Sequence, residues 1–400
     1  MNWKKGKNKA EDNGEFFFRY LSQKKPKGIK VYFAIDKNSE DYKRLKSFGN
    51  ILDLKSNRYK RTFLESDKII SSISDEWVNN PFKEDKIYIR DLLHFDFIFL
   101  NNGILKNDLS SSLNRFDKNY SLIVISSKDE YKSIMNFNYG YNKNNLFLAG
   151  MPRFDYLPRY KNQKKENNII IMPTFREINN KKTKFINHKS NNSYLLNFTY
   201  FYEFYNNLIN SPQLLLVMKK YNYKGFLCLN HDFESNKNFI KNEYFSIIEK
   251  CDYKKLLLTA SLFVIDYSNI FLELGYLKKP IIYAHFDYDQ YKIINHQIEK
   301  FNYLRDGFGP ICKDIECSIK EIIKNIENKS LFKNRYMKRI RKFFSFLDKK
   351  NNDRIFLEIT NKIKEKKNKY NLMYIIIAIL MYIFCYKFYI YIEKIYELND

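Results

Sequence analysis

The chain alternates short apolar runs of strand length with helical segments over most of its length. The predicted strands are 30–35, 68–72, 95–100 and 121–126 in the first half, and 168–172, 224–229, 262–266 and 280–283 in the second. Parallel strands need crossover helices, which cover both faces of their sheet and leave the strands apolar throughout. The sequence therefore predicts parallel α/β layers.

A polar stretch separates the two sets of strands. Residues 159–167 include Lys161, Lys164 and Lys165, which is typical of a linker. A length of 400 residues also favours two domains over one. We predict two Rossmann-like domains, 1–160 and 161–346, that face a cleft, then a basic helical segment at 347–370 and an apolar helix at 371–392.

Three turns place polar side chains directly after an apolar run: Gly150–Leu157, Met172–Glu177 and Val264–Tyr283. In α/β domains, ligands bind in the crevice outside the carboxyl ends of the strands. Arginine side chains, hydroxyls and the N–H groups at helix starts are the donors that bind phosphate. We therefore expect a phosphate-bearing ligand at these turns.

The formal net charge of +25 has two interpretations, a nucleic-acid or anionic-membrane partner and general drift toward lysine-rich composition. The sequence contains no base-stacking or helix-in-groove signature, so we predict no nucleic-acid partner. The five cysteines form no C-x-x-C pair, and their odd number argues against a disulfide framework and favours a reducing compartment. Residues 1–15 are charged and contain no signal-peptide core.

The C-terminal region combines a basic segment with an apolar one. Residues 333–369 hold 14 Lys/Arg and 4 Asp/Glu, a net charge of +10, and Lys387 is the only charge in residues 372–392. A helix that spans a bilayer needs about 20 apolar residues, and a basic flank faces the cytoplasm. We predict contact with an anionic membrane surface at the cytoplasmic face of the plasma membrane. The alternative is a helix that lies in the interface or packs on the core.

Several motifs occur together in one order. They are Gly-x-Pro-Arg-x-Asp-x-Leu at 150–157, Pro-Thr-Phe-Arg at 173–176, Asp-Tyr-Ser-Asn at 266–269, Lys-Pro at 279–280, and the segments 287–291 and 307–310. From Asp12 to Phe346 the chain resembles the CDP-glycerol glycerophosphotransferases, the polymerases and primases of teichoic-acid and capsule synthesis. The resemblance implies a GT-B fold. It also implies transfer of polyol phosphate from a CDP-activated donor to a lipid-linked polymer acceptor, with release of CMP and without a cofactor.

Two departures from the family pattern affect the predicted chemistry. The family has a His-Gly pair after an early strand, whose His is held to be the general base, and here these positions are Asn102 and Gly103. The family's His-Pro pair is His231 and Asp232. Residues 1–9 are also too polar for the apolar strand with which the family opens, so we expect the start to be clipped.

The resemblance implies a donor-side set of substrate-binding residues. They are Arg153, Thr174, Arg176, Asp266, Ser268, Asn269, Glu273 and Gly309. Arginines at strand ends can bind phosphate oxygens through both fork nitrogens, although Arg153 could instead pair with Asp155 or another acid. Ser268 and Asn269 also fall where a helix should start and could serve as caps. Asp266 could only order its turn, and Glu273 could hold the ribose hydroxyls or be an exposed helix acid.

Asn102, His231 and Asp108 form the predicted catalytic set. Asn102 can orient an acceptor hydroxyl but cannot take its proton, and loss of a general base costs about 10²–10⁴ in rate. Asp108 and His94 are possible substitute bases, or ordinary surface residues, and His231 would stabilise phosphate charge or be a satisfied loop histidine. The chain is therefore either a working transferase or a degenerate member that binds without turnover. The sequence leaves open CDP-glycerol against CDP-ribitol, primase against polymerase, and metal dependence.

Overall fold

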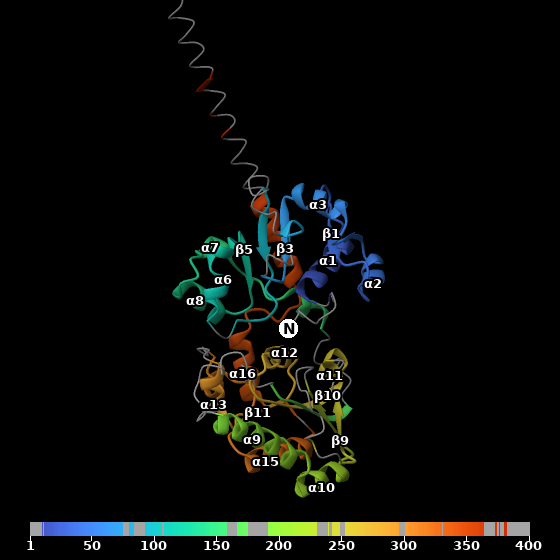
Figure 1. The fold of residues 1–400 in the computed structure, drawn as a ribbon, viewed down its shortest axis with the longest axis vertical. Coiled ribbons are helices and arrows are strands. Elements are labelled where there is room, and N and C mark those ends of the chain that lie inside the picture. The colour runs from blue at the N-terminus through green and yellow to red at the C-terminus, as the bar shows by residue number, and fades with distance from the viewer. Residues whose placement is uncertain are drawn as a thin grey trace, which may run out of the picture. The chain divides into compact units, whose positions relative to one another are not determined.

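The computed structural model describes most of the chain. The described residues are 10, 12–74, 80–83, 93–105, 108–157, 166–174, 191–229, 239, 242–248, 253–295, 301–329, 331–363, 373, 376 and 380–381. The chain divides into two compact units, residues 1–349 and 350–400. The first unit carries all the strands described below (Figure 1). In the second unit, residues 351–363 are helical.

The strands form three sheets, and every strand pairing in them is parallel. β1 (Tyr32–Ile35) pairs with β2 (Asn50–Asp53). The second sheet has the order β3-β4-β5-β6, with bounds Lys68–Ser71, Asp96–Phe99, Leu122–Ile125 and Leu146–Leu148. The third has the order β12-β11-β10-β7-β8-β9, with bounds Ile311–Cys312, Ile281–Ala284, Ala260–Ile265, Glu166–Met172, Lys224–Cys228 and Phe245–Ile248. The predicted parallel α/β class is confirmed.

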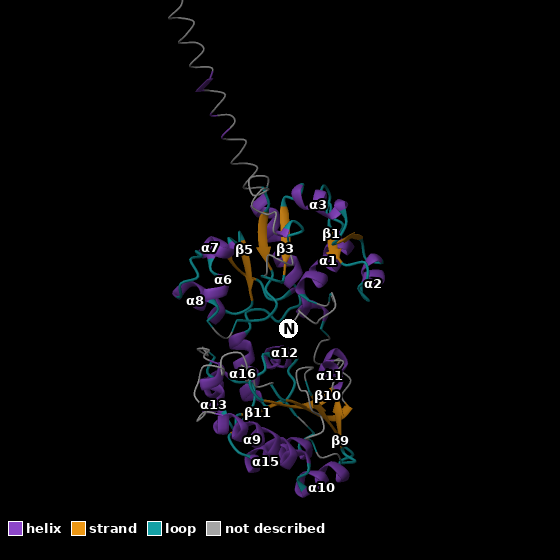
Figure 2. Cartoon of the chain, in the orientation of Figure 1, coloured by secondary structure: helices purple, strands orange, loops and turns teal. Residues whose placement is uncertain are grey.

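Helices connect the strands in both halves (Figure 2). Those of the first half are α1 (Asn13–Lys24), α2 (Tyr42–Lys46), α3 (Asn57–Leu64), α6 (Ser110–Leu113), α7 (Arg115–Lys118), α8 (Lys128–Asn136), η3 (Lys143–Asn145) and η4 (Pro152–Tyr156). Those of the second half are α9 (Asn191–Ile209), α10 (Pro212–Lys220), α11 (Tyr253–Thr259), α12 (Ile270–Tyr276), α13 (Tyr288–Asn295), α14 (Tyr303–Asp306), α15 (Ile315–Glu327) and α16 (Asn334–Phe343).

The six-stranded sheet is buried on both faces. Ile169 and Ile171 of β7 pack in one cluster with residues of α9, α10 and α15, which lie together on one side of the sheet (Figure 1). Ile170 and Met172 belong to the opposite cluster, with residues of α12 and α16. Successive side chains of a strand point to opposite faces, so the continuous apolar run in β7 serves two cores. This packing fixes the register in which Met172 lies beside Ile265, and so aligns the carboxyl ends of β7 and β10.

The four-stranded sheet has its own core, in which Ile123 and Ile125 of β5 pack with Ile134 of α8. After α16 the chain returns to this sheet, because Ser127 and Phe344 form an antiparallel bridge. The backbone N–H of Ser345 also donates to the carbonyl of Ser126 (3.4 Å). The end of β5 is therefore held by a segment more than 200 residues downstream.

Some predictions fall where the structure gives no test. The domain boundary near residue 160 and most of the apolar segment 371–392 lie outside the described residues, so both stay predictions. Within the part of the chain that is described, no helix combines the length and apolarity needed to cross a bilayer. Cys312 and Cys317 are free thiols, whereas Cys228 is disulfide-bonded, a bond that the argument from cysteine number did not anticipate.

Candidate functional site

Thr174 and Asp266 meet at the carboxyl edge of the six-stranded sheet. The backbone N–H of Thr174 donates to both carboxylate oxygens of Asp266 (3.0 Å each), and its hydroxyl donates to Oδ1 (2.5 Å). Asp266 is fully buried. It also accepts hydrogen bonds from the backbone N–H of Tyr267 (2.6 Å) and the hydroxyl of Tyr205 (3.4 Å). Asp266 thus ties the ends of β7 and β10 together, the ordering role that the sequence left open for it.

His285 is a residue of this edge that the sequence analysis missed. It directly follows β11, and its Nε2 lies 3.1 Å from the carbonyl oxygen of Asp266. Its ring is nearly parallel to that of Tyr288, at 5° with the centroids 5.6 Å apart, and stacks on that of Tyr267 at 4.8 Å. The rule that selected Thr174, a polar residue directly after an apolar strand, would also have selected His285.

Ser268 and Asn269 follow Asp266 at the start of α12. The Oγ of Ser268 accepts a hydrogen bond from the backbone N–H of Ile270 (3.4 Å), so this side chain is a weak helix cap. Asn269 occupies the N-cap position, but its side chain makes no capping hydrogen bond. Asn269 is exposed and Ser268 is half-buried. Of the two, Asn269 has the side chain that is more open to a ligand.

Arg153 and Glu273, both predicted to bind substrate, contact each other. A guanidinium nitrogen of Arg153 in η4 forms an ion pair with the carboxylate of Glu273 in α12, and the two side chains are only 16% and 22% exposed. The other terminal nitrogen donates to the carbonyl of Asn102 (2.8 Å). The ion pair that the sequence left open for Arg153 therefore forms, with Glu273 as the acid. One side chain links the turn after β4 to the helix after Asp266.

Asn102 lies in a tightly held turn. Asn101 has left-handed backbone geometry (φ 58°), which asparagine tolerates better than most residues. Its side-chain oxygen accepts from the backbone N–H of Asn102 (2.9 Å), and its carbonyl accepts from the side chain of buried Asn13 (2.6 Å). Asn13 in turn accepts from the backbone N–H of Arg153 (3.2 Å). The side chain of Asn102 is exposed and bonds to no residue that the structure describes.

The structure places the other first-half candidates in ordinary structural roles. Asp108 accepts from the backbone N–H of Ser110 (2.9 Å) at the start of α6 and lies against the hydroxyl of Tyr139. His94 is exposed and precedes β4, whereas Asn102 follows that strand, so the two are at opposite ends of the sheet. His94 is therefore not placed to take a proton beside Asn102, and the catalytic role predicted for Asp108 stays a prediction.

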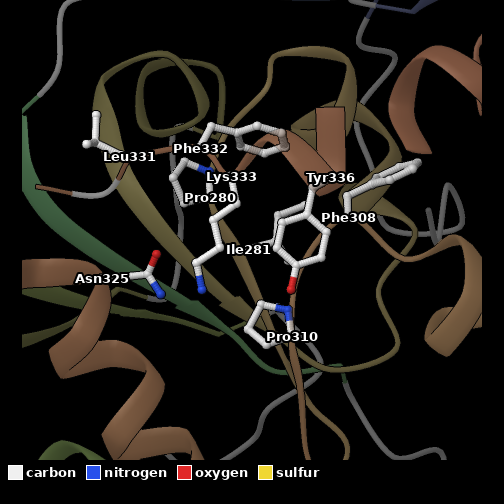
Figure 3. Close-up of a pocket in the computed structure, with 9 residues that line it drawn as sticks. All are labelled: Pro280, Ile281, Phe308, Pro310, Asn325, Leu331, Phe332, Lys333 and Tyr336. Atoms are coloured by element: carbon white, nitrogen blue, oxygen red, sulfur yellow. The ribbon is translucent and has the colours of Figure 1, made fainter. Parts of the chain in front are cut away.

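Gly309 does not lie at the carboxyl edge. It is next to the first residue of β11, and a β-carbon there would come within 1.9 Å of the carbonyl oxygen of Ile281. A small pocket is lined by Ile281, Pro310 and Tyr336 among others (Figure 3). Close backbone packing, which only glycine allows, explains Gly309 without a ligand.

Arg176 and His231 lie outside the described residues, and their predicted roles stay predictions. Among the residues that the structure does describe, no three His, Cys, Asp or Glu side chains are grouped so as to hold a metal ion. The described part of the edge is therefore Thr174, Asp266, Asn269 and His285, joined through Glu273 and Arg153 to the Asn102 turn.

Comparison with known proteins identifies the family. The family model described as CDP-Glycerol:Poly(glycerophosphate) glycerophosphotransferase matches residues 4–361. The chain belongs to this family. The resemblance predicted from the motifs is thereby confirmed. This glycerophosphotransferase family member is also similar over most of its length to the minor teichoic acid biosynthesis protein GgaB of Bacillus subtilis (strain 168), with 36% identity over 359 residues.

Two further likenesses accompany the match to GgaB. The teichoic acid glycerol-phosphate primase of Bacillus subtilis (strain 168) is 26% identical over 226 residues, which is 53% of this chain. The solved structure of the wall teichoic acid polymerase TagF shares the fold, with a TM-score of 0.56, 18% identity and coverage of 90% of this chain and 87% of that one. The match to GgaB covers 88% of this chain but only 39% of the length of GgaB. The match to the primase covers 52% of the length of the primase.

Proposed function

We propose that this chain transfers glycerol phosphate from CDP-glycerol to a teichoic-acid-like polymer acceptor. In the reaction, an acceptor hydroxyl oxygen forms a bond to the β-phosphorus of the donor. The bond from that phosphorus to the bridging oxygen breaks, CMP leaves with this oxygen, and the proton of the hydroxyl passes to solvent. Family membership and a TagF structure that contains CDPG support the choice of donor.

The observation that carries the proposal is the link between the two sides of the site. The side chain of Arg153 contacts the Asn102 turn and pairs with Glu273, seven residues after Asp266. In this proposal the donor phosphates lie over the edge ordered by Asp266, where Arg176 and His231 neutralise their charge. Asn102 orients the acceptor hydroxyl from the other side by a hydrogen bond.

A second candidate function rests on Asn102. The position of the family's general base carries Asn102, whose exposed carboxamide cannot take a proton, and His94 lies at the opposite end of the sheet. A chain of this kind could bind CDP-polyol, or a partner enzyme, without turnover. In this alternative the donor-side residues still bind the CDP-polyol, and only the proton transfer from the acceptor hydroxyl is lost.

The test measures CMP release from CDP-glycerol by the purified full chain, with and without a short glycerol-phosphate oligomer as acceptor. Acceptor-dependent CMP release supports the transferase. Binding of CDP-glycerol by calorimetry without CMP release, in the presence of acceptor, supports the non-catalytic alternative. If the chain neither binds nor turns over CDP-glycerol, while CDP-ribitol works in the same assay, the choice of donor is wrong.

We further propose that the chain works at the cytoplasmic face of the plasma membrane on a lipid-linked acceptor. The support is the +10 charge of residues 333–369 and the apolar composition of residues 372–392. Deleting residues 370–400 should move the protein from the membrane pellet to the soluble fraction of lysed cells. A control that replaces the same residues with a Gly/Ser segment of equal length separates loss of apolar surface from loss of length. Unchanged recovery in the pellet would contradict membrane attachment through this segment.

A further inference from the structure

We propose that Glu130 is a positioning residue whose carboxylate holds the turn at Asn101, Asn102 and Gly103 in the shape that presents Asn102 to the acceptor. The proposal rests on the proposed function for what the turn does, and on the structure for how the turn is held. Glu130 is the third residue of α8 and is 2% exposed. None of the family motifs in the sequence includes it.

The carboxylate of Glu130 connects three backbone segments. Its Oε1 accepts hydrogen bonds from the side-chain amide of Asn101 and from the backbone N–H of Leu105 (3.1 Å each). Its Oε2 accepts from the backbone N–H of Ser126 (2.7 Å). Glu130 therefore bonds on both sides of the Asn102 turn and to the end of the neighbouring strand β5. Each partner is a donor, which suits the ionised carboxylate, because a protonated carboxyl would add an O–H donor to a site already lined by donors.

Helix capping alone does not account for these contacts. A glutamate at the third position of a helix ordinarily reaches back to the N-cap residue of the same helix. Glu130 makes this contact too, since its carboxylate interacts with the backbone N–H of Ser127, whose Oγ accepts from the backbone N–H of Glu130 (3.1 Å). The bonds to Asn101 and Leu105 instead span 29 and 25 positions of sequence. They add nothing to the start of α8, but they fix the left-handed conformation of Asn101.

The charge state of Glu130 gives the proposal a pH signature. Burial raises the pKa of this carboxyl to about 7, against the opposing effect of its backbone donors. The titratable groups nearest to it are the hydroxyl of Tyr139 and, hydrogen-bonded to that hydroxyl, Asp108, while Arg153 reaches the turn from the other side. As pH falls through 7, Glu130 takes up a proton, and its new O–H donor faces the N–H donors of the site, which weakens the hydrogen bonds to them. The turn should therefore loosen below pH 7.

The effect on global stability has the opposite sign. Because the pKa in the folded state lies above the usual value of 4.5, the folded protein binds more protons than the unfolded chain between pH 4.5 and about 7. The buried charge thus costs stability above pH 7, and that cost disappears as pH falls. Local loosening of the turn without a fall in melting temperature distinguishes this role from simple support of the fold.

The test compares amide hydrogen exchange in the wild type, Glu130→Gln and Glu15→Gln, each as the full chain at pH 8 and pH 6. Glu15 is a matched control because it is equally buried, at 1% exposed, but its carboxylate binds Arg44. At pH 8 the amides of Leu105 and Ser126 should exchange roughly ten-fold faster in Glu130→Gln than in the wild type, as expected for a lost buried acceptor. The Glu15→Gln protein should match the wild type at both amides.

Lowering the pH to 6 should bring the wild type toward Glu130→Gln, after correction for intrinsic exchange rates. Exchange in Glu130→Gln within two-fold of the wild type at both pH values overturns the proposal. If CMP release is measurable, its rate should fall below pH 7 in the wild type and lose this dependence in Glu130→Gln. If no variant releases CMP, the proposed function fails, but the exchange rates still decide whether Glu130 holds the turn.

Discussion

The substitution Asn102→His is expected to raise the rate of CMP release by roughly 10²- to 10⁴-fold, the range that a general base contributes. The side chain at this position is exposed, and its backbone is fixed by Arg153 and by Asn101. A neutral imidazole there can take the proton of the acceptor hydroxyl near pH 7, which a carboxamide cannot do. The measurement is steady-state CMP release at saturating CDP-glycerol and acceptor.

The matched control for this experiment is Asn136→His, which adds the same ring to an exposed position at the far end of α8. It should leave the rate unchanged. A gain confined to Asn102→His would show that the scaffold is intact and lacks only a base. Equal rates in the wild type and Asn102→His, with turnover in both, would mean that Asn102 already suffices or that the proton leaves by another route.

A second large effect is expected from Asp266→Ala, which should lower the free energy of unfolding by about 3–5 kcal/mol, as for other buried groups whose partners are left unpaired. The loss removes the shared acceptor of Thr174, Tyr205 and Tyr267 at the centre of the sheet edge. Asp266→Asn should recover little, because its amide nitrogen would face N–H and O–H donors. Urea unfolding followed by tyrosine fluorescence measures the change.

Asp289→Ala is the control for Asp266, since it removes an exposed carboxylate from the first turn of α13. Its effect should stay within about 0.5 kcal/mol, as is usual for surface positions. A loss below about 1 kcal/mol for Asp266→Ala would contradict the ordering role. Asp266 would then be available to a ligand instead of being committed to the protein.

The predictable part of the fold followed from strand composition. β7 and β10 were found because each is a long apolar run, and parallel pairing then placed Thr174 and Asp266 at one edge. β2, β6, β9 and β12 were not predicted, because they have two to four residues and little apolar length to distinguish them. Short strands of this kind can be identified only from the strands they pair with in the sheet, and the sequence does not show these pairings.

The sequence identified many of the individual residues of the site, but it did not show which of them contact one another. Arg153 and Glu273 were both selected as substrate ligands, yet their ion pair joins positions 120 residues apart, and no local pattern indicates it. Glu130 was missed because an acid in the first turn of a helix is ordinary, and only the fold shows which backbone groups it reaches. His285 was missed although the strand-end rule covers it.

The bridge between Ser127 and Phe344 means that the four-stranded sheet β3-β4-β5-β6 is completed by a segment far away in the sequence. A fragment that stops after η4 would lack the segment around Phe344 and Ser345 that pairs with the end of β5. In that segment, the backbone N–H of Ser345 donates to the carbonyl of Ser126. Attaching residues 344–349 to such a fragment through a flexible linker would restore these contacts at the end of β5. The natural unit for dissecting or exchanging the half that contains the β3–β6 sheet is therefore two pieces of chain, and recombination at a single crossover near residue 160 separates them.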